Sequence, residues 1–263
     1  MEQNVEFIRE YEVRTIDCGL TTNMSVEGAF CVVEDACSSL LAQINMTGVK
    51  LGEKYGVTWV YTKHKMQIFK DLPWLSKYKV RCYVSKISKV VTVFDIQLYN
   101  EKGEIAVYSQ LEMCLIELSL GKICPLSKVG FDKIPVEPVS SQSIFLRFSE
   151  VDGKESYVAK VRACNIDCNN HTNNTEYVRI LLDSFSLEEL RSKKIVGFEV
   201  NYINQSHYND ELSVLRYSDG NVERVDIKIG EKYIINPWGY AVVLRSGPGR
   251  SDLRILLRTF SEL

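Results

Sequence analysis

The sequence lacks a long apolar run, an excess of basic charge and a secretion signal. No stretch approaches the roughly 18 apolar residues that a helix needs to cross a bilayer, and residues 1–5 carry neither a basic nor an apolar signal segment. The 32 lysines and arginines are balanced by 34 acidic residues, and the net charge of −2 offers little attraction to nucleic-acid phosphates. We therefore expect a cytoplasmic protein that binds no nucleic acid and does not insert into membranes.

Histidines are scarce and the cysteines form no metal-binding motif. There are eight cysteines and three histidines, and no Cys-x-x-Cys pair occurs. Structural zinc sites need four such ligands at regular spacing, so we expect no metal and no cofactor. Scattered thiols suit a reducing compartment, and the cysteines within the apolar patterns of predicted helices and strands are expected to be small buried side chains.

The 263 residues, 45% of them apolar, are enough for two packed cores. Residues 26–44 have apolar side chains at helical spacing, and strand-like segments rich in Val, Ile and Tyr surround them. A long helix followed by an antiparallel meander is an α+β pattern. The expected strands of this first unit, residues 1–122, are 7–14, 56–70, 78–87, 90–99 and 105–116.

A second unit, residues 142–263, repeats the pattern after a proline-containing linker at residues 123–141. Its expected elements are a strand at 156–163, a helix at 175–191, and strands at 195–204, 211–218, 222–229, 239–244 and 253–259. Both units would then consist of a long helix wrapped by a curved antiparallel sheet.

The stretch NIDCNNHTNN at residues 165–174 has the strongest signature of chemistry. It combines a carboxylate that can act as base or nucleophile, an imidazole, and amides that can orient water. It directly precedes the predicted second helix, whose free N–H groups favour developing negative charge. The alternative is an ordinary turn, since Asp and Asn commonly cap helices.

A related stretch lies 150 residues upstream. Residues 16–25 share Ile, Asp, Cys, Thr and Asn with residues 166–175. In this alignment the first copy has Gly19 and Thr21 where the second has Asn169 and His171. If the chemistry needs amide and imidazole together, only the second unit can perform it.

The pattern Asp-x-Asn-x-His-x-Asn-Asn, formed by Asp167, Asn169, His171, Asn173 and Asn174 and followed by Tyr177, resembles that of the acyl-acyl carrier protein (ACP) thioesterases of plants and bacteria. Residues 59–63 (WVYTK) and Pro73-Trp74 also resemble the N-terminal domain of that family, so the likeness covers nearly the whole chain. It implies two hotdog domains in one chain and hydrolysis of a fatty acyl-ACP thioester without metal or cofactor.

The resemblance also implies roles for the turn. Asp167 would act as base or nucleophile, Asn169 would hold the attacking water or the carbonyl, and His171 would orient or assist the carboxylate. The sequence departs from the family at Gln205-Ser206, where the family usually has Glu-Cys. Gln205 cannot accept a proton as Glu does, although it can hold water, and Ser206 could donate to Asp167. Both are also consistent with polar strand residues facing solvent.

The other expected site residues bind the acyl chain and the carrier protein. Trp59, Met66, Ile68 and Trp74 are candidates for an acyl-binding first unit, with ordinary core packing as the alternative, and Asn173 and Asn174 are candidates for substrate contact. ACP is acidic in this family's systems, so a cationic patch should steer docking. The candidates for that patch are Arg179, Arg191, Lys193 and Lys194.

The sequence alone leaves open the thioester carrier, the presence of catalysis and the oligomeric state. A hotdog hydrolase of acyl-CoA and a non-catalytic acyl-binding double hotdog fit the same sequence, and so do a monomer and a homodimer. The other two histidines rank below His171: His64 lies between two lysines on an expected solvated face, and His207 lies in a polar turn.

Overall fold

The structure is a computed structural model that describes residues 5–138, 154–219, 222–235 and 241–246. The chain divides into two compact units, Met1–Gln142 and Ser143–Leu263. Within the described ranges, no helix is long and apolar enough to cross a membrane.

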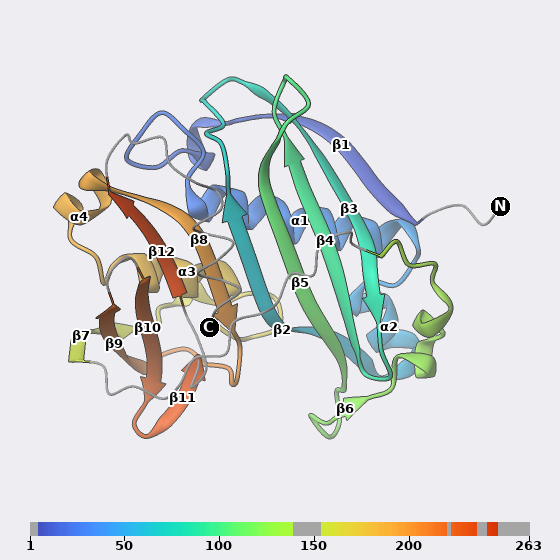
Figure 1. The fold of residues 1–263 in the computed structure, drawn as a ribbon. Helices are drawn as coiled ribbons and strands as arrows, with labels where there is room; N and C mark the ends of the chain where they lie inside the picture. Colours follow the sequence, from blue (N-terminus) through green and yellow to red (C-terminus); the bar gives the residue numbers. More distant parts are fainter. Residues whose placement is uncertain (1–4, 139–153, 220–221, 236–240, 247–263) are drawn as a thin grey trace. The chain divides into compact units, whose positions relative to one another are not determined.

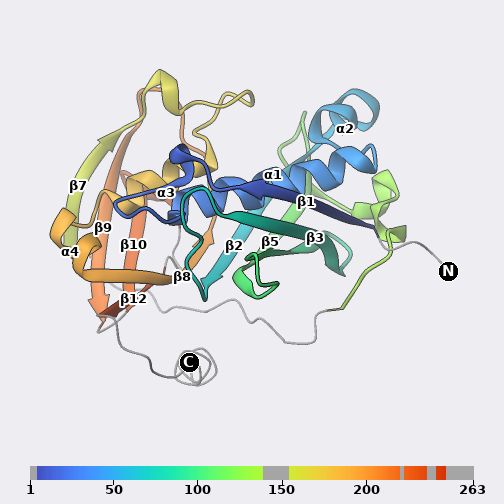
Figure 2. The same cartoon turned by 90° about the horizontal axis from the view of Figure 1, so that it is seen from above.

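Unit 1 is built on helix α1 (Val26–Gln43), which begins at Ser25, whose side chain accepts a hydrogen bond from the Gly28 N–H. Its apolar spacing buries one face, including Phe30 and Leu40, and this face packs on a curved antiparallel sheet (Figures 1 and 2). The strand order is β1-β3-β4-β5-β2. The strands are β1 (Glu6–Glu12), β2 (Val57–Ile68), β3 (Lys77–Ile87), β4 (Val91–Tyr99) and β5 (Ile105–Glu117).

A second helix, α2 (Gly48–Tyr55), was not predicted. Its two glycines argue against a helix, since each costs about 1 kcal/mol relative to alanine. Good caps and one buried contact compensate. Thr47 accepts from the Lys50 N–H, Leu51 is buried, and the helix ends at Gly56 in the left-handed conformation, with φ +65°.

The segment expected to link the units begins with packed structure. Residues Ile123–Cys124 form β6, which pairs with β5, and two short 3-10 helices follow, η2 (Leu126–Val129) and η3 (Phe131–Lys133). Leu126 and Phe131 are fully buried. Residues 123–138 therefore contribute to the core of unit 1.

Unit 2 has the same strand order, β7-β9-β10-β12-β8. The strands are β7 (Lys154–Lys160), β8 (Lys193–Asn201), β9 (Glu211–Asp219), β10 (Val222–Ile229) and β12 (Ala241–Ser246), and an additional strand, β11 (Lys232–Ile235), pairs with β10. Each unit is thus a helix packed on an antiparallel sheet, as the α+β prediction required. The strand predicted at residues 253–259 lies outside the described residues.

The single helix predicted at residues 175–191 is in fact two helices, α3 (Asn174–Leu182) and α4 (Leu187–Ser192). The break has a local cause. Ser186 and Glu189 form a capping box, in which each side chain accepts from the backbone N–H of the other, and this starts a new helix. Phe185, in the connection, is buried.

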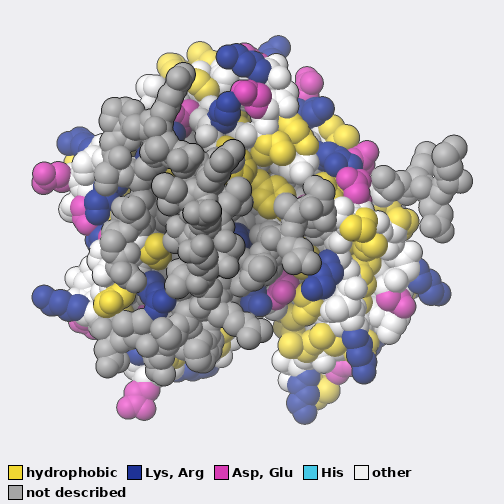
Figure 3. All heavy atoms as spheres, in the orientation of Figure 1, with side chains coloured by type: hydrophobic (Ala, Val, Ile, Leu, Met, Phe, Trp, Pro, Cys, Tyr) yellow, Lys and Arg dark blue, Asp and Glu magenta, His cyan; other side chains and the backbone are white. Residues whose placement is uncertain are grey.

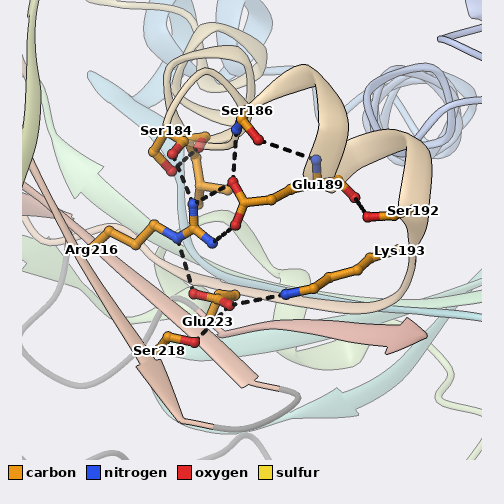
Figure 4. Close-up of polar contacts among 9 residues, drawn as sticks. Ser184, Ser186, Glu189, Ser192, Lys193, Arg216, Ser218 and Glu223 are labelled. Carbon is orange, nitrogen blue, oxygen red and sulfur yellow. Dashed lines mark hydrogen bonds and ion pairs between the residues drawn. The ribbon is translucent and has the colours of Figure 1, made fainter.

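Arg216 on β9 ties α4 to the sheet (Figure 4). Its guanidinium lies 2.6 Å from Glu189 on α4 and 3.0 Å from the buried carboxylate of Glu223 on β10, and it donates to the Ser184 carbonyl. Hydrogen bonds from Arg216 lower the pKa of Glu189 to about 2. Helix α4 is therefore held by a partly buried and charge-assisted contact.

Candidate active site

The turn at residues 167–171 lies between the 3-10 helix η4 (Ala163–Asn165) and helix α3. The Asp167 N–H donates to the His171 carbonyl at 2.9 Å, and a bridge between Ile166 and Thr172 closes its base. Asn170 has φ +65°, a left-handed conformation that asparagine adopts more readily than most residues. The expected position of this turn just ahead of a helix N-terminus is confirmed.

The Asp167 carboxylate is held by the other predicted catalytic residues. Its Oδ1 accepts from the backbone N–H of Asn169 at 2.8 Å and of His171 at 3.4 Å, and its Oδ2 lies 3.3 Å from the Asn169 Nδ2. The side-chain oxygen of Asn169 is itself an acceptor and can hold a water molecule. A carboxylate, an amide and an imidazole are thus brought together on one short turn.

The imidazole of His171 lies against that of His207. The ring centroids are 5.2 Å apart, with the planes at 68° in an edge contact. Partial burial, and next the charge of His207, lower the pKa of His171, while Asp167 acts to raise it. His171 is therefore neutral at neutral pH. His207 ranked below His171 as a site candidate, since nothing in its local sequence pattern indicates that this loop folds back beside the turn.

Ser206 takes part in holding that loop. Its fully buried Oγ lies 2.7 Å from the Thr172 hydroxyl and 2.7 Å from the Tyr177 hydroxyl, and its N–H donates to the Tyr177 oxygen. The expected hydrogen bond to Asp167 is replaced by these two contacts. Gln205, the next residue back, is exposed. The sequence missed the bracing role of Thr172 and Tyr177, although both lie in or next to the motif.

The two asparagines after the turn belong to the helix start. The Asn173 side chain accepts from the Thr175 N–H at 2.9 Å and caps α3, and Asn174 is the first helical residue. The side-chain oxygen of Asn173 therefore serves as a helix cap, which is the alternative to a catalytic role for residues of this kind.

The hydrogen bonds of the two units reveal the true register of the repeat. Ser25 N–H donates to the Asp17 carbonyl at 2.8 Å, and Asn173 N–H donates to the Asn165 carbonyl at the same distance. The bridge between Cys18 and Met24 recurs between Ile166 and Thr172. These correspondences are separated by 148 residues, so the alignment by identical letters, separated by 150, is wrong by two positions.

In the structural register, unit 1 lacks all three predicted catalytic groups. Gly19, Thr21 and Asn23 stand where unit 2 has Asp167, Asn169 and His171. Asp17, which the letters aligned with Asp167, is a buried acid whose side chain caps its own 3-10 turn and pairs with the Arg14 guanidinium at 2.8 Å. Its counterpart is Asn165.

The neighbouring loop also corresponds between the units. Met24 N–H donates to the Leu72 carbonyl and Thr172 N–H donates to that of Ser206. Pro73 bridges Asn23 in unit 1, and the matching pair in unit 2 is His207 and His171. The positions of His171 and His207 therefore match those of Asn23 and Pro73 in unit 1, whose side chains cannot titrate.

The predicted acyl-binding residues are spread along unit 1. Trp59 donates its Nε1–H to the Met46 carbonyl at 2.8 Å and packs edge-on against Phe131. Met66 is buried, Ile68 is half-buried, and Trp74 is 48% exposed. Because Trp59 and Ile68 are nine positions apart on one strand, with about 3.3 Å per residue, they are roughly 30 Å apart. Among the contacts of the described residues, none brings these four side chains together in one site.

His64 is fully buried, which corrects the expectation of a solvated face. Its ring packs 4.2 Å from that of Phe30, and its Nε2 lies 2.7 Å from the Ser109 Oγ. A β-bulge between Tyr61 and Lys63 shifts the alternation of β2 and turns His64 toward the core. Burial lowers the pKa of His64 to about 3.

The predicted docking cations are on α3, α4 and the start of β8. Arg179 pairs with Glu176, and the Lys193 Nζ lies 3.9 Å from the Glu223 carboxylate. Arg191 and Lys194 are exposed. On the face seen in Figure 3, the lysines and arginines of the described residues are interspersed with acidic side chains.

Comparisons with known proteins assign the family. Residues 4–128 match the acyl-ACP thioesterase N-terminal domain, and residues 149–236 match the acyl-ACP thioesterase C-terminal domain, so the two matches span most of the chain. The chain belongs to the acyl-ACP thioesterase family. A search of curated proteins finds no match.

Solved structures share the fold of this thioesterase. An acyl-ACP thioesterase from Bacteroides thetaiotaomicron is 18% identical with a TM-score of 0.81, and the match covers 91% of this chain and 98% of that one. The 12:0-ACP thioesterase from Umbellularia californica is 16% identical with a TM-score of 0.83, covering 93% and 99%. The predicted tandem hotdog fold and the predicted family are confirmed. The chain is a thioester hydrolase that acts on acyl-ACP.

Proposed function

We propose that the turn of unit 2 performs the hydrolysis, with Asp167 as the base, Asn169 as the group that holds the attacking water, and His171 as a neutral imidazole that orients it. The observation that carries this assignment is the hydrogen-bonded turn itself, in which the Asp167 carboxylate accepts from the backbone N–H groups of Asn169 and His171. Unit 1, folded in the same way, has none of these three groups at the matching positions.

The chemistry needs one water molecule and one shuttled proton. The water oxygen attacks the thioester carbonyl carbon as Asp167 takes a water proton. The carbon–sulfur bond then breaks, and the protonated Asp167 returns the proton to the departing thiolate, giving a fatty acid and the free phosphopantetheine thiol. The first N–H groups of α3 favour the negative charge that develops nearby.

The test is release of free fatty acid from a ladder of acyl-ACPs. We expect Asp167→Asn to lower kcat/KM by about 10²–10⁴-fold, the usual contribution of a general base. Cys168→Ser is the matched control, because Cys168 is exposed on the same turn and has no part in the proposal. An Asp167→Asn protein that stays folded and cleaves at the wild-type rate would overturn the assignment.

We also propose that unit 1 provides the acyl-chain site, with Trp59, Met66, Ile68 and Trp74 as candidates. Support comes from the apolar buried face of α1 and from the lack of an acid and imidazoles at the positions of unit 1 that match Asp167, His171 and His207. Met66→Trp should shift preference toward shorter acyl chains without loss of turnover on short substrates. An unchanged chain-length profile for substitutions at all four positions would count against it.

The carrier protein is proposed to dock on the cations near α4. Arg191 and Lys194, whose side chains are exposed on α4 and at the start of β8, are the pair to test. Arg191→Glu combined with Lys194→Glu should raise KM for acyl-ACP and weaken its salt dependence while leaving acyl-CoA hydrolysis unchanged. Equal rates on acyl-CoA and acyl-ACP in the wild type would argue that no carrier-specific surface exists.

We also propose that the protein is cytoplasmic and that it is a monomer or a homodimer. All eight cysteines are free, which supports the cytoplasm. Whether the chain is a monomer or a homodimer is decided by its mass in solution, for which light scattering suffices.

A further inference from the structure

His207 lies beside the proposed site without a part in the hydrolysis just described. Its ring meets that of His171 edge to face at 5.2 Å between centroids. The loop that carries it is fixed from both sides. Ser206 is buried against Thr172 and Tyr177, and the His207 N–H donates to the Asp210 carboxylate at 2.7 Å. A ring on so constrained a loop can set the orientation of its neighbour.

We propose that His207 is the positioning residue for His171, fixing the plane of that imidazole and keeping it in the neutral form that can accept a hydrogen bond from the attacking water. The inference rests on the proposed function of the Asp167 turn. With Asp167 and His171, His207 gives the site a third titratable group in a chain that has Gln205 rather than a second carboxylate.

The repeat gives independent support. The positions of His171 and His207 correspond to those of Asn23 and Pro73 in unit 1, where the two backbones form a bridge. The unit without the acid thus also lacks both imidazoles, and the unit with the acid has both. A histidine placed at position 207 only to fill space would have no reason to accompany the other catalytic groups.

The charged and titratable groups around His171 determine the sign of the effect. Asp167 on its own turn favours the imidazolium, and His207 on the facing loop disfavours it. Asp210 lies next to His207, with its Oδ2 3.9 Å from the His207 Nδ1, and the Tyr177 phenol from α3 is hydrogen-bonded to Ser206. Removing the imidazole at position 207 should therefore raise the pKa of His171.

Two variants separate the packing and the charge of this ring. His207→Phe keeps an aromatic edge but cannot ionise, and we expect it to move the acidic limb of the kcat/KM profile to higher pH while keeping the plateau rate at alkaline pH. His207→Ala loses both effects, and we expect the same shift together with a plateau about tenfold to a hundredfold lower. Tyr208→Ala, a variant of the exposed neighbouring ring, should leave both quantities unchanged.

A second readout does not depend on activity. The chain has only three histidines, so the ring proton of His171 can be assigned and followed by NMR titration in the full-length protein. A higher His171 midpoint in His207→Phe than in the wild type supports the proposal. If the midpoint and the pH profile are the same in both proteins, His207 has no such role. Failure of the proposed function is distinguished from failure of this proposal by the Asp167→Asn protein, which would then still be active.

Discussion

The buried imidazole of His64 makes the stability of unit 1 sensitive to mild acid. The single hydroxyl proton of Ser109 goes to the Lys65 carbonyl at 2.8 Å, so the His64 Nε2 must be the donor to the Ser109 Oγ. The Nδ1 of His64 then carries a lone pair, and among the described residues it has no hydrogen-bond partner. Protonation would place a charged N–H in the core without an acceptor.

The direction and size of the change in unfolding free energy follow from the pKa values of His64 in the unfolded and folded states. In the unfolded chain His64 binds a proton below its ordinary pKa of 6.5, whereas the folded form does so only near 3. The unfolded state therefore binds more protons between these values, and stability falls as the pH falls through this window. Integrating from about pH 7 to about pH 5 gives a loss of roughly 2 kcal/mol from this one group.

The assay is urea unfolding of the wild type and of His64→Gln at both pH values. The glutamine amide can donate to Ser109 but cannot titrate, so the variant should lose about 2 kcal/mol less than the wild type on acidification. Other titrating groups cancel in this comparison. Equal losses in wild type and His64→Gln would refute the reasoning.

Two further predictions concern the helices. An alanine Cβ at Gly28 in α1 would lie 2.3 Å from the backbone oxygen of Asp17, whereas at Gly52 in α2 the nearest atom is 3.4 Å away. Gly28→Ala should therefore destabilise the protein by about 1–3 kcal/mol, and Gly52→Ala should be neutral or stabilise it by up to about 1 kcal/mol, both measured by denaturant unfolding; the reverse order would contradict the packing. Arg216→Met leaves a buried glutamate without its guanidinium and should cost roughly 3–5 kcal/mol, and a melting temperature equal to that of the wild type would contradict the anchoring of α4.

The sequence predicted the elements whose signals are local. The apolar spacing of α1 placed its bounds within one residue, and the Val, Ile and Tyr content of the predicted strands placed theirs within three residues of the observed bounds. The break between α3 and α4 was also visible locally, in the capping box of Ser186 and Glu189, but the apolar pattern continuing past it hid the break. Helix α2 was missed because its glycines outweighed its caps in a propensity argument.

The site residues show where sequence reasoning stops. Asp167, Asn169 and His171 are close in the chain, and their hydrogen bonds are short-range, so the motif predicted their contact. His207 and His64 depend on tertiary structure. One requires a distant loop to return to the turn, and the other requires a bulge that reverses which side chains of β2 face the core. Neither event leaves a periodic trace in the sequence.

The register of the repeat changes what unit 1 implies about the site. The alignment by letters matched Asp17 to Asp167 and so suggested an acid retained in both units. The hydrogen bonds assign Asp17 to a structural cap with Arg14, and they match Gly19 to Asp167. Building a hydrolytic turn in unit 1 would then require changes at Gly19, Thr21, Asn23 and Pro73 together. Because one substitution at Asn23 would provide an imidazole without an acid beside it, a single change in unit 1 cannot create a second site, and Asp167→Asn alone should lower hydrolysis by the about 10²–10⁴-fold expected for loss of a general base.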